Sequence, residues 1–580
     1  MKKSVSFFIL VLLINIHSYV LAAPSFKWIR HNSDTVGLYN KFEISFWLDT
    51  EFDNPFDPDD IDVMATFTAP SGKTWKIPGF YSSVPRTSWV FNFAWYVRFS
   101  ADEPGIWSYV IDVRDRNGQC SSESSVFTVV ESDTHGPVKI SSSKRYLEHA
   151  DGTPFYGIGM WVNNQEKAEV MDELKNVGVN FVGYVMTPIE SWASGLGRYD
   201  QELCRKVDKM LELLEERDMQ LALSFWMHSF LSETVWGGGN IAWFTLPYQT
   251  ITECKDFYGS EEAWKYQEKL YRYMIARWGY SPSLAIWYIV HEVNGTDGWV
   301  HGDTLQANRW AKEVHEYLKI HDPWQHLTIG TRSGGSNQWW QEGNEIFDLA
   351  GREVYEAQGH PINRTGQIDK DETHPLTYSY GNYHTQVNKL WNSFEKPAVI
   401  PESGWDHTFY EMSMPGYLAQ YHNAMWICLA SGTAMSPTWW AYSGRINDNI
   451  VNNQILYHRR FTNQIPFSKL TGIAPVEIKN SGGNAYGIKS DQLIFGWAVN
   501  ANGDMSGKTI TLPDTGKGKY ILKLYHTWRG QFLEYDDGNT EQIIESAGRS
   551  VSFDIPILKI QRGHAEYIGQ DIAFLLTPLK

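Results

Sequence analysis

Two stretches of the chain decide its fold: residues 284–295, LAIWYIVHEVNG, and residues 396–404, KPAVIPESG. In each, an uninterrupted apolar run leads to a glutamate, in the first stretch after one histidine, and then, within three residues, to a glycine. Such short apolar runs are typical of parallel strands that are buried on both faces. We therefore expect Glu292 and Glu402 each to lie at the carboxyl end of a buried strand, where a loop begins.

The chain around these stretches alternates between strand and helix patterns, from about residue 136 to residue 465. A clear helical segment is 261–278, where Ala263, Leu270, Met274 and Trp278 recur at helical spacing. Further helices are expected at 201–217, 305–321 and 415–430. Eight strands are expected, at 154–160, 180–186, 220–226, 284–290, 326–330, 346–354, 397–400 and 435–440.

Repeated strand–helix units predict the α/β class with a parallel sheet, and eight units predict a (β/α)8 barrel over residues 136–465. The alternative is an open, doubly wound sheet of the dinucleotide-binding kind. That alternative is disfavoured because no GxGxxG follows an early strand.

The regions on both sides of the predicted barrel have the period-two pattern of antiparallel strands. Phe42, Ile44 and Phe46 alternate with polar residues in the first region, and Tyr520, Leu522 and Leu524 recur at every second position in the last. We predict an N-terminal β-sandwich over residues 23–135 and a C-terminal β-sandwich over residues 466–580.

The chain begins with a signal-peptide pattern. Lys2 and Lys3 precede a short apolar run, and Ala22 provides a small residue for cleavage. The predicted signal peptide is residues 1–22, and the predicted location is secreted or periplasmic. The alternative is an uncleaved anchor, although the apolar run is shorter than the roughly 20 residues of a spanning helix. No second membrane segment is expected.

Composition excludes some classes of function and favours others. The net charge of −17 argues against nucleic acid as a partner. The four cysteines are far apart and form no zinc motif, so we expect no metal and no cofactor. One disulfide is possible, but the sequence does not show which cysteines would form it. The 26 Trp, 31 Tyr and 28 Phe suit a carbohydrate partner, because sugars stack their C–H faces on aromatic rings, but aromatic residues also fill cores.

The two strand-ending glutamates suggest a reaction. In a barrel, functional residues lie at the carboxyl ends of the strands, and strands four and seven lie on opposite sides of the mouth. Two carboxyl groups facing each other across a sugar are what glycoside hydrolysis requires. We therefore expect Glu292 to be the general acid/base and Glu402 the nucleophile. Each glutamate alone could instead be a salt-bridged rim residue, and Glu353 is another carboxylate of the cleft.

These two motifs resemble those of glycoside hydrolase clan A. The resemblance covers the whole barrel and implies an acid/base glutamate after strand four and a nucleophile glutamate after strand seven, with net retention. One departure concerns His291, because members of the clan usually have an asparagine there that binds the sugar 2-hydroxyl. His291 either keeps this role, marks an altered subsite, or is a structural residue.

The resemblance also implies further substrate-binding residues. Tyr355 follows strand six, where the clan places a tyrosine that donates a hydrogen bond to the nucleophile. Trp439 or Trp440, at the end of strand eight, matches the aromatic floor beneath the reacting sugar. Three more residues end strands one and three and are candidates for lining the cleft: Trp161, Trp226 and His228. Each of these residues has core packing as its alternative.

The flanking regions resemble known modules of bacterial polysaccharide-degrading enzymes. Residues 25–130, which contain EPGIWSY at 103–109, are similar to an uncharacterised sandwich domain that precedes such barrels. Residues 520–530 resemble part of a domain labelled collagen-binding in some glycosidases, for which packing or sugar binding is the alternative. The expected substrate is a β-linked plant or algal polysaccharide or oligosaccharide. A transglycosylase and a noncatalytic carbohydrate-binding protein are the alternatives.

Overall fold

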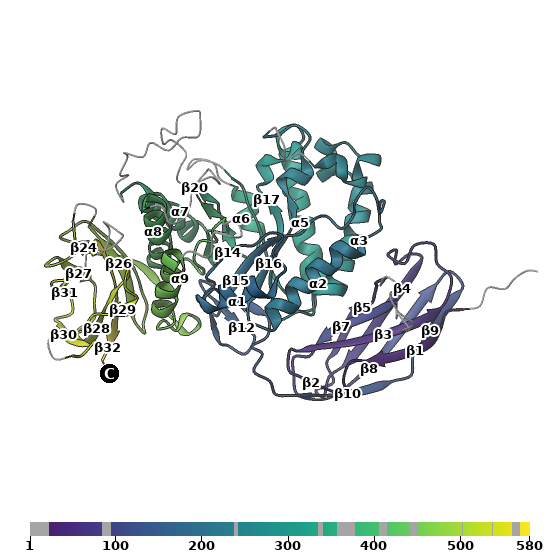
Figure 1. Cartoon of the computed structure of the whole chain (residues 1–580), viewed down its shortest axis with the longest axis horizontal. Helices are drawn as coiled ribbons and strands as arrows, with labels where there is room; N and C mark the ends of the chain where they lie inside the picture. The colour runs from purple at the N-terminus through teal and green to yellow at the C-terminus, as the bar shows by residue number, and fades with distance from the viewer. Residues whose placement is uncertain are drawn as a thin grey trace, which may run out of the picture.

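The computed structural model describes residues 23–83, 94–236, 242–333, 340–355, 377–404, 415–440, 449–500, 503–535, 538–558 and 569–579. The predicted signal peptide, residues 1–22, lies outside these ranges. Figure 1 shows an elongated molecule, with the N-terminal strands at one end, a helix-rich central part, and the C-terminal strands at the other end. Within the described ranges, no helix has the length and apolar character needed to cross a membrane.

The N-terminal part consists of two sheets that share one hydrophobic core. One sheet has the order β1-β3-β7-β6, and the other has the order β2-β10-β8-β4-β5, with β9 paired to β8. The alternation predicted from the sequence holds, because Phe42, Ile44 and Phe46 of β3 are fully buried. The strands are β1 Ser25–His31, β2 Thr35–Gly37, β3 Lys41–Asp49, β4 Ile61–Thr68, β5 Thr74–Pro78, β6 Phe80–Tyr81, β7 Trp95–Ser100, β8 Gly105–Asp115, β9 Gly118–Ser121 and β10 Ser125–Val130.

The central part contains a parallel sheet of five strands in the order β14-β15-β16-β17-β18. Two further parallel pairs, β19–β21 and β20–β22, continue it. A small antiparallel sheet, β11-β12-β13, precedes β14. The strands are β11 Val138–Ile140, β12 Leu147–His149, β13 Pro154–Phe155, β14 Gly159–Trp161, β15 Phe181–Val185, β16 Gln220–Met227, β17 Leu284–His291, β18 Leu327–Gly330, β19 Ala350–Gly351, β20 Val354–Tyr355, β21 Ala398–Val399 and β22 Ser403–Gly404.

Single main-chain hydrogen bonds join the edges of neighbouring strands where no regular ladder forms. The amide of Leu349 donates to the carbonyl of Thr328, which links the β18 and β19 segments, and Ala434 donates to Ala398. Parallel bridges join Met160 to Trp439 and Ser403 to Trp439. Main-chain hydrogen bonds therefore connect the eight predicted segments into a continuous ring.

Three of the predicted strands are wrong in extent. The first is divided between β13, which belongs to the antiparallel sheet, and β14. The sixth begins as a helix and continues as β19 and β20, because Asp348 turns the chain and accepts hydrogen bonds from Thr328. The eighth, residues 435–440, forms isolated bridges only, since Pro437 has no amide hydrogen for a regular ladder.

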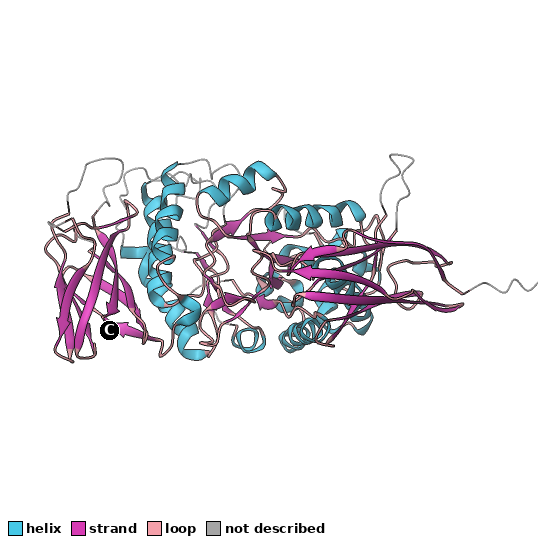
Figure 2. Ribbon diagram, turned by 90° about the horizontal axis from the view of Figure 1, so that it is seen from below, coloured by secondary structure: helices cyan, strands magenta, loops and turns pink. Residues whose placement is uncertain are grey.

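Helices flank the strands of the central part (Figure 2). Helix α2 packs against β16, α5 against β17 and α7 against β21. Helix α3 has the predicted bounds and begins at a serine cap, because Ser260 accepts a hydrogen bond from Ala263. The helices are α1 Ala168–Asn176, α2 Gln201–Glu215, α3 Glu261–Trp278, α4 Asp297–Val300, α5 Thr304–His321, α6 Gln341–Ile346, α7 Thr377–Ser393, α8 Pro415–Ser431 and α9 Asn449–Thr462.

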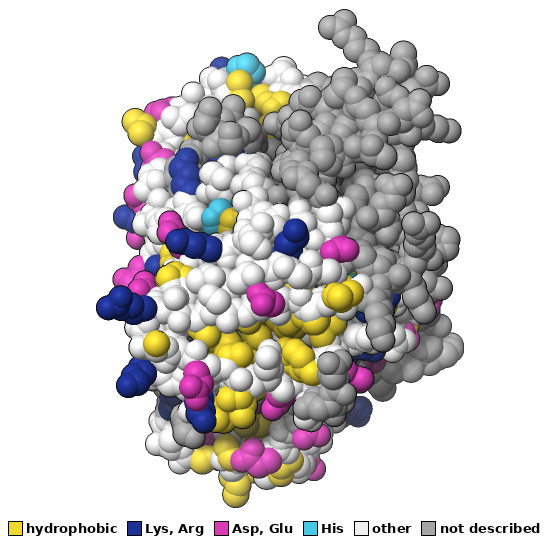
Figure 3. Space-filling model, turned by 90° about the vertical axis from the view of Figure 1, so that its left-hand side faces the viewer, with side chains coloured by type: hydrophobic (Ala, Val, Ile, Leu, Met, Phe, Trp, Pro, Cys, Tyr) yellow, Lys and Arg dark blue, Asp and Glu magenta, His cyan; other side chains and the backbone are white. Residues whose placement is uncertain are grey.

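The C-terminal part again has two sheets, with the orders β23-β25-β26-β32-β28-β29 and β24-β27-β31, and β30 paired to β28. Its outer face carries hydrophobic side chains among charges of both signs (Figure 3). The strands are β23 Ala474–Glu477, β24 Lys479–Asn480, β25 Asn484–Lys489, β26 Ile494–Val499, β27 Thr509–Pro513, β28 Gly518–His526, β29 Gln531–Phe532, β30 Gln542–Ser546, β31 Ser550–Asp554 and β32 Asp571–Pro578.

Buried ion pairs fix both ends to the central part. Arg98 of β7 and Arg277 of α3 bind the same carboxylate, that of Asp208 in α2, and the two arginines hold the pKa of Asp208 well below its usual range despite burial. At the other end, His422 of α8 lies 3.0 Å from the carboxylate of Asp571 in β32. Because these contacts are buried, the central ring and its flanking sheets form one continuous structure.

Candidate active site

Glu292 lies directly after β17, at the carboxyl end of the ring, as the sequence predicts. Its backbone adopts the left-handed conformation, with φ 55° and ψ 60°, which is uncommon for a residue other than glycine. The amide of Glu292 donates to the hydroxyl of Thr331, at 3.2 Å. Its carboxylate Oε2 lies 3.2 Å from Nε2 of His228. A strained backbone held by these contacts points the carboxyl group in one direction.

His228 therefore belongs to the site, as the second partner of Glu292. It follows β16 and begins a short 3-10 helix, His228–Leu231. Burial lowers the pKa of His228, and the neighbouring carboxylate of Glu292 opposes this effect. A neutral imidazole at this position donates one hydrogen bond and adds no full charge beside the carboxyl group.

Glu402 lies between β21 and β22 and is almost fully buried. Each of its two oxygens has its own partner. The hydroxyl of Tyr355 donates a hydrogen bond to Oε1, and Nε2 of His291 contacts Oε2. Burial and the charge of Glu402 raise the pKa of Tyr355 well above its ordinary value, so the phenol keeps its hydrogen. The carboxylate is thus oriented by one hydrogen-bond donor and by a close contact with the imidazole.

A third carboxyl group, that of Glu353, lies between the other two and is completely buried. The hydroxyl groups of Thr331 and Tyr288 donate to its Oε1, and His291 Nε2 lies 3.6 Å from the same atom. Burial raises the pKa of Glu353 well above its ordinary value, and the charges of Glu292 and Glu402 raise it further. The carboxyl groups of Glu353 and Glu402 and the imidazole of His291 therefore form one buried cluster, to which Thr331 joins the backbone amide of Glu292.

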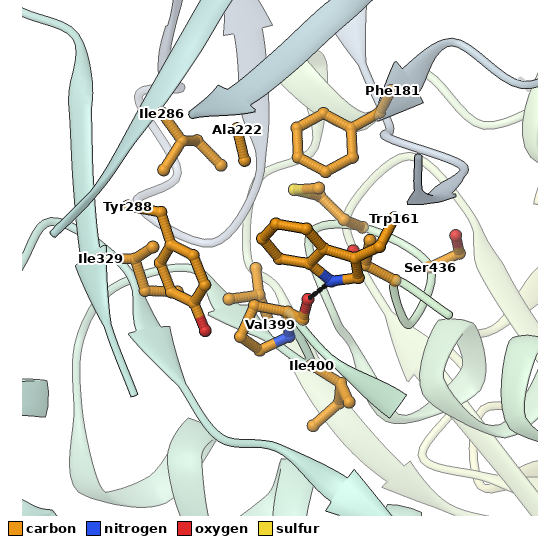
Figure 4. Close-up of a pocket in the computed structure, with 12 residues that line it drawn as sticks. Trp161, Phe181, Ala222, Ile286, Tyr288, Ile329, Val399, Ile400 and Ser436 are labelled. Carbon is orange, nitrogen blue, oxygen red and sulfur yellow. Dashed lines mark hydrogen bonds between the residues drawn. The ribbon is translucent and has the colours of Figure 1, made fainter. Parts of the chain in front are cut away.

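Aromatic rings surround this cluster. The ring of His291 lies 4.7 Å from that of Trp161 and 6.0 Å from that of Trp440, measured between centroids. Nε1 of Trp161 donates to the carbonyl of Pro401, next to Glu402. Figure 4 shows Trp161 facing Tyr288 across a small apolar cavity inside the ring of strands. Trp161 therefore separates this apolar interior from the polar cluster at the mouth.

Two predicted site residues do not reach the cluster. Trp226 is buried, its Nε1 donates to the hydroxyl of Tyr271 in α3, and its ring packs edge-on against that of Phe257. Trp439 is also buried, with its ring against that of Tyr421 in α8. Both side chains are buried, and within the described residues the ring of Trp440 contacts that of His291, whereas that of Trp439 packs against Tyr421.

Some residues of the site were not predicted from the sequence. Thr331 and Tyr288 hold Glu353 and received no role. Trp236 is half exposed, lies 4.9 Å from His228, and adopts a left-handed backbone. One signal was available for Glu353: it precedes Tyr355 by two residues, and residues two apart on a strand face the same side. Nothing in the sequence indicates that Trp236 approaches His228.

The cluster also has the spacing of a metal site, because donor atoms of His291, Glu353 and Glu402 lie within 4.8 Å of one another. However, His291 Nε2 contacts Glu402 directly, and the Thr331 hydroxyl donates to Glu353. We assign these residues no metal-binding role.

Comparisons with known proteins support the fold. Residues 35–114 match a family model described as a domain of unknown function (DUF5060), and no curated protein matches the chain. A solved structure described as a "putative glycoside hydrolase" from Bacteroides vulgatus ATCC 8482 is 16% identical, with a TM-score of 0.62 over 94% of this chain and 100% of that one. The chain therefore has the fold of that protein over nearly its whole length.

Two further structures are more distant. One is a glycoside hydrolase family 5 protein from Bacteroides vulgatus ATCC 8482, with 14% identity and a TM-score of 0.47 over 77% of this chain and 94% of that one. The other is a glycoside hydrolase family 5 mannosidase from Rhizomucor miehei, with 12% identity and a TM-score of 0.42 over 58% of this chain and 100% of that one.

Proposed function

We propose that the protein is a retaining glycoside hydrolase in which Glu402 is the nucleophile and Glu292 is the general acid/base. In this proposal the ring of strands is a (β/α)8 barrel over residues 136–465, with β-sandwiches over residues 23–135 and 466–580. One observation carries the proposal. The glutamates that follow β17 and β21 reach one cluster at the carboxyl end of the ring, because His291 contacts Glu402 and Thr331 joins the amide of Glu292 to Glu353, which lies 3.6 Å from His291.

The reaction follows from the different surroundings of the two glutamates. A carboxylate oxygen of Glu402 attacks the anomeric carbon, and the bond to the leaving oxygen breaks while that oxygen takes the proton of Glu292. Glu292, now ionised, then removes a proton from water. The water oxygen attacks the same carbon, and the ester bond to Glu402 breaks to regenerate the carboxylate.

Net retention requires the two carboxyl groups to lie about 5–5.5 Å apart, whereas inversion requires room for a water molecule between them. Glu402 contacts His291, His291 lies 3.6 Å from Glu353, and the hydroxyl of Thr331 joins Glu353 to the backbone amide of Glu292. The proposal of retention rests on both glutamates reaching this one cluster. Tyr355 and His291 also orient Glu402 as an attacking group needs.

The sugar in the reacting position would lie against Trp440 and Trp161, with His291 beneath it. We propose a β-linked plant or algal polysaccharide or oligosaccharide as the substrate class, and a secreted or periplasmic location for the enzyme. The support for the location is the signal-peptide pattern at residues 1–22.

The test is to screen aryl β-glycosides and a polysaccharide panel, and then to follow the first product by proton NMR. We expect the anomer formed first to have the configuration of the substrate. Initial release of the opposite anomer would mean that water attacks directly and would contradict the role of Glu402. Transfer to added alcohols in place of hydrolysis would identify a transglycosylase that uses the same residues.

A further inference from the structure

Two exposed aromatic side chains lie on neighbouring loops at the carboxyl end of the ring. Trp192 is 60% exposed and belongs to the loop between β15 and α2. Phe244 is 66% exposed and belongs to the short 3-10 helix Trp243–Thr245, between β16 and α3. The amide of Trp192 donates to the carbonyl of Thr245 at 2.8 Å, so the two loops are directly joined. Neighbouring exposed aromatic residues are typical of a binding surface.

This pair belongs to the part of the mouth where Glu292 lies. The amide of Ala242, just before the 3-10 helix, donates to the carbonyl of Ser229 at 2.8 Å. Ser229 follows His228, whose Nε2 lies 3.2 Å from the carboxylate of Glu292. Main-chain hydrogen bonds therefore connect the partner of Glu292 to the segment of Phe244 and, through it, to the loop of the exposed tryptophan.

A buried carboxyl group fixes the two loops to each other. Glu190 is fully buried, its Oε1 accepts from the amide of Gly197 at 2.9 Å, and its Oε2 accepts from the hydroxyl of Tyr248 at 2.6 Å. Gly197 lies in the loop of Trp192, and Tyr248 lies in the segment of Phe244. Because a buried carboxyl group is stable only when its oxygens are hydrogen-bonded, this joint sets the loops before any ligand arrives. A preformed surface loses less conformational entropy when it binds.

The loop segments that carry the two rings have almost no charged residues. Residues 242–252 contain no Asp, Glu, Lys or Arg, and Glu190 is the only charged residue among residues 186–197. The side chain of Arg198 is directed to the N-terminal part, where it donates to the carbonyl of Asp53. Exposed rings on an uncharged surface suit the C–H faces of neutral sugars. A sulfated or uronic polymer would instead favour a surface with cationic groups that bind its anions.

We propose that Trp192 and Phe244 form an outer binding site for the chain of a neutral polysaccharide, so that the protein acts on chains that extend beyond the sugars at the reacting bond. The two residues bind sugar units and take no part in breaking the bond. The inference rests on the proposed function and narrows its substrate class to electrically neutral polymers.

The first test compares a long and a short substrate in Trp192→Ala and Phe244→Ala. On the neutral polysaccharide that the wild type cleaves best, each variant should lower kcat/KM by about 2- to 10-fold, because each loses one aromatic contact. On the shortest aryl glycoside that the wild type cleaves, kcat/KM should not change, since that substrate ends before the outer site. The matched control is Trp47→Ala, which removes an exposed tryptophan of β3 and should affect neither substrate.

Two kinetic outcomes would overturn the inference. Equal losses on the long and the short substrate would place the effect at the reacting bond. Unchanged kinetics on the polysaccharide in both variants would show that the rings bind no sugar.

The second test measures binding without turnover and separates this inference from the proposed function. Native gels containing galactomannan, xyloglucan or arabinoxylan should retard the full-length Glu402→Gln protein with at least one of these neutral polymers. Adding Trp192→Ala or Phe244→Ala should largely remove the retardation, whereas adding Trp47→Ala should not. Retardation by none of the three, by acidic polygalacturonan alone, or to an equal degree in all variants would overturn the inference. Retardation that depends on Trp192 in a protein whose wild type cleaves no glycoside would leave the binding site standing and contradict the proposed function.

Discussion

The hydroxyl of Tyr355 donates its hydrogen to Oε1 of Glu402, across the gap between β20 and the end of β21. Nε2 of His291 contacts the other oxygen, so residues from two different strands hold the carboxylate. This arrangement fixes the direction of one oxygen lone pair toward the mouth of the ring. It also means that the phenol and the imidazole must release part of their interaction when Glu402 forms a covalent bond.

Removing the phenol hydroxyl tests this orientation. Tyr355→Phe keeps the ring and should lower kcat/KM by roughly 10- to 100-fold, because a hydrogen bond to a charged group contributes about 1.5–3 kcal/mol. The measurement is steady-state kinetics on an aryl glycoside, with circular dichroism to check the fold. Unchanged kinetics in a folded Tyr355→Phe protein would show that the phenol does not assist Glu402.

Trp236 should contribute to binding on the leaving-group side. Its half-exposed ring lies against His228, the partner of Glu292, and over the backbone of Gly295. Trp236→Ala should raise KM for an oligosaccharide by about 2- to 10-fold, since an aromatic contact contributes roughly 0.5–1.5 kcal/mol. Substrates with a small leaving group should be affected less. Trp28→Ala, an exposed tryptophan of β1, is the matched control and should leave KM unchanged.

The sequence predicts the bounds of elements that bury only one side, because such burial imposes a regular pattern of apolar residues. Helix α3 has the predicted bounds because its apolar stripe and its serine cap are both local features. The sequence did not predict that residues 435–440 form only isolated bridges, where Pro437 interrupts the ladder. It also did not predict the direction of the Trp226 side chain. A strand that is buried on both faces has no polar side, so its sequence does not say whether Trp226 points to the mouth or to the helices.

The candidate site also contains some residues that the sequence predicts and others that it does not. Glu292 and Glu402 could be placed because each ends an apolar run, but their partners come from other strands. Thr331 and His228 meet Glu292 only because neighbouring strands lie side by side in the ring, and their separation in sequence gives no sign of it. The left-handed backbone of Glu292 is likewise a result of packing and has no local signal.

Acid should destabilise the protein in part through His458 of α9. Burial lowers the pKa of His458 to about 3, with His422 and Arg459 acting in the same direction. The unfolded chain, with an ordinary histidine pKa near 6.5, binds the proton more readily, so stability falls as pH drops below about 6.5. At pH 5 this loss amounts to about 2 kcal/mol for this residue.

The measurement is the free energy of unfolding in urea at pH 7 and pH 5, for the wild type and for His458→Gln. The glutamine cannot take up a proton, so the variant should lose less stability between the two pH values, by about 2 kcal/mol. Equal losses in the two proteins would show that His458 is not an acid-sensitive residue. The comparison uses differences, so a constant destabilisation by the substitution does not affect it.

The central claim is that Glu402 and Glu292 have different roles in a double displacement, and azide distinguishes them directly. In Glu402→Ala, azide can enter the space of the lost carboxylate and displace the leaving group once, which gives a glycosyl azide of inverted configuration. In Glu292→Ala, Glu402 still forms the covalent intermediate, and azide then displaces it, so two inversions give a retained product. Both reactions use a dinitrophenyl glycoside, whose leaving group needs little protonation.

The decisive measurement is therefore the anomeric configuration of the glycosyl azide that each variant forms, read by proton NMR. The account predicts an inverted azide from Glu402→Ala and a retained azide from Glu292→Ala, with little turnover in either variant when azide is absent. The opposite pair of configurations would exchange the two roles. Normal hydrolysis by a folded Glu402→Ala protein without azide would contradict the account.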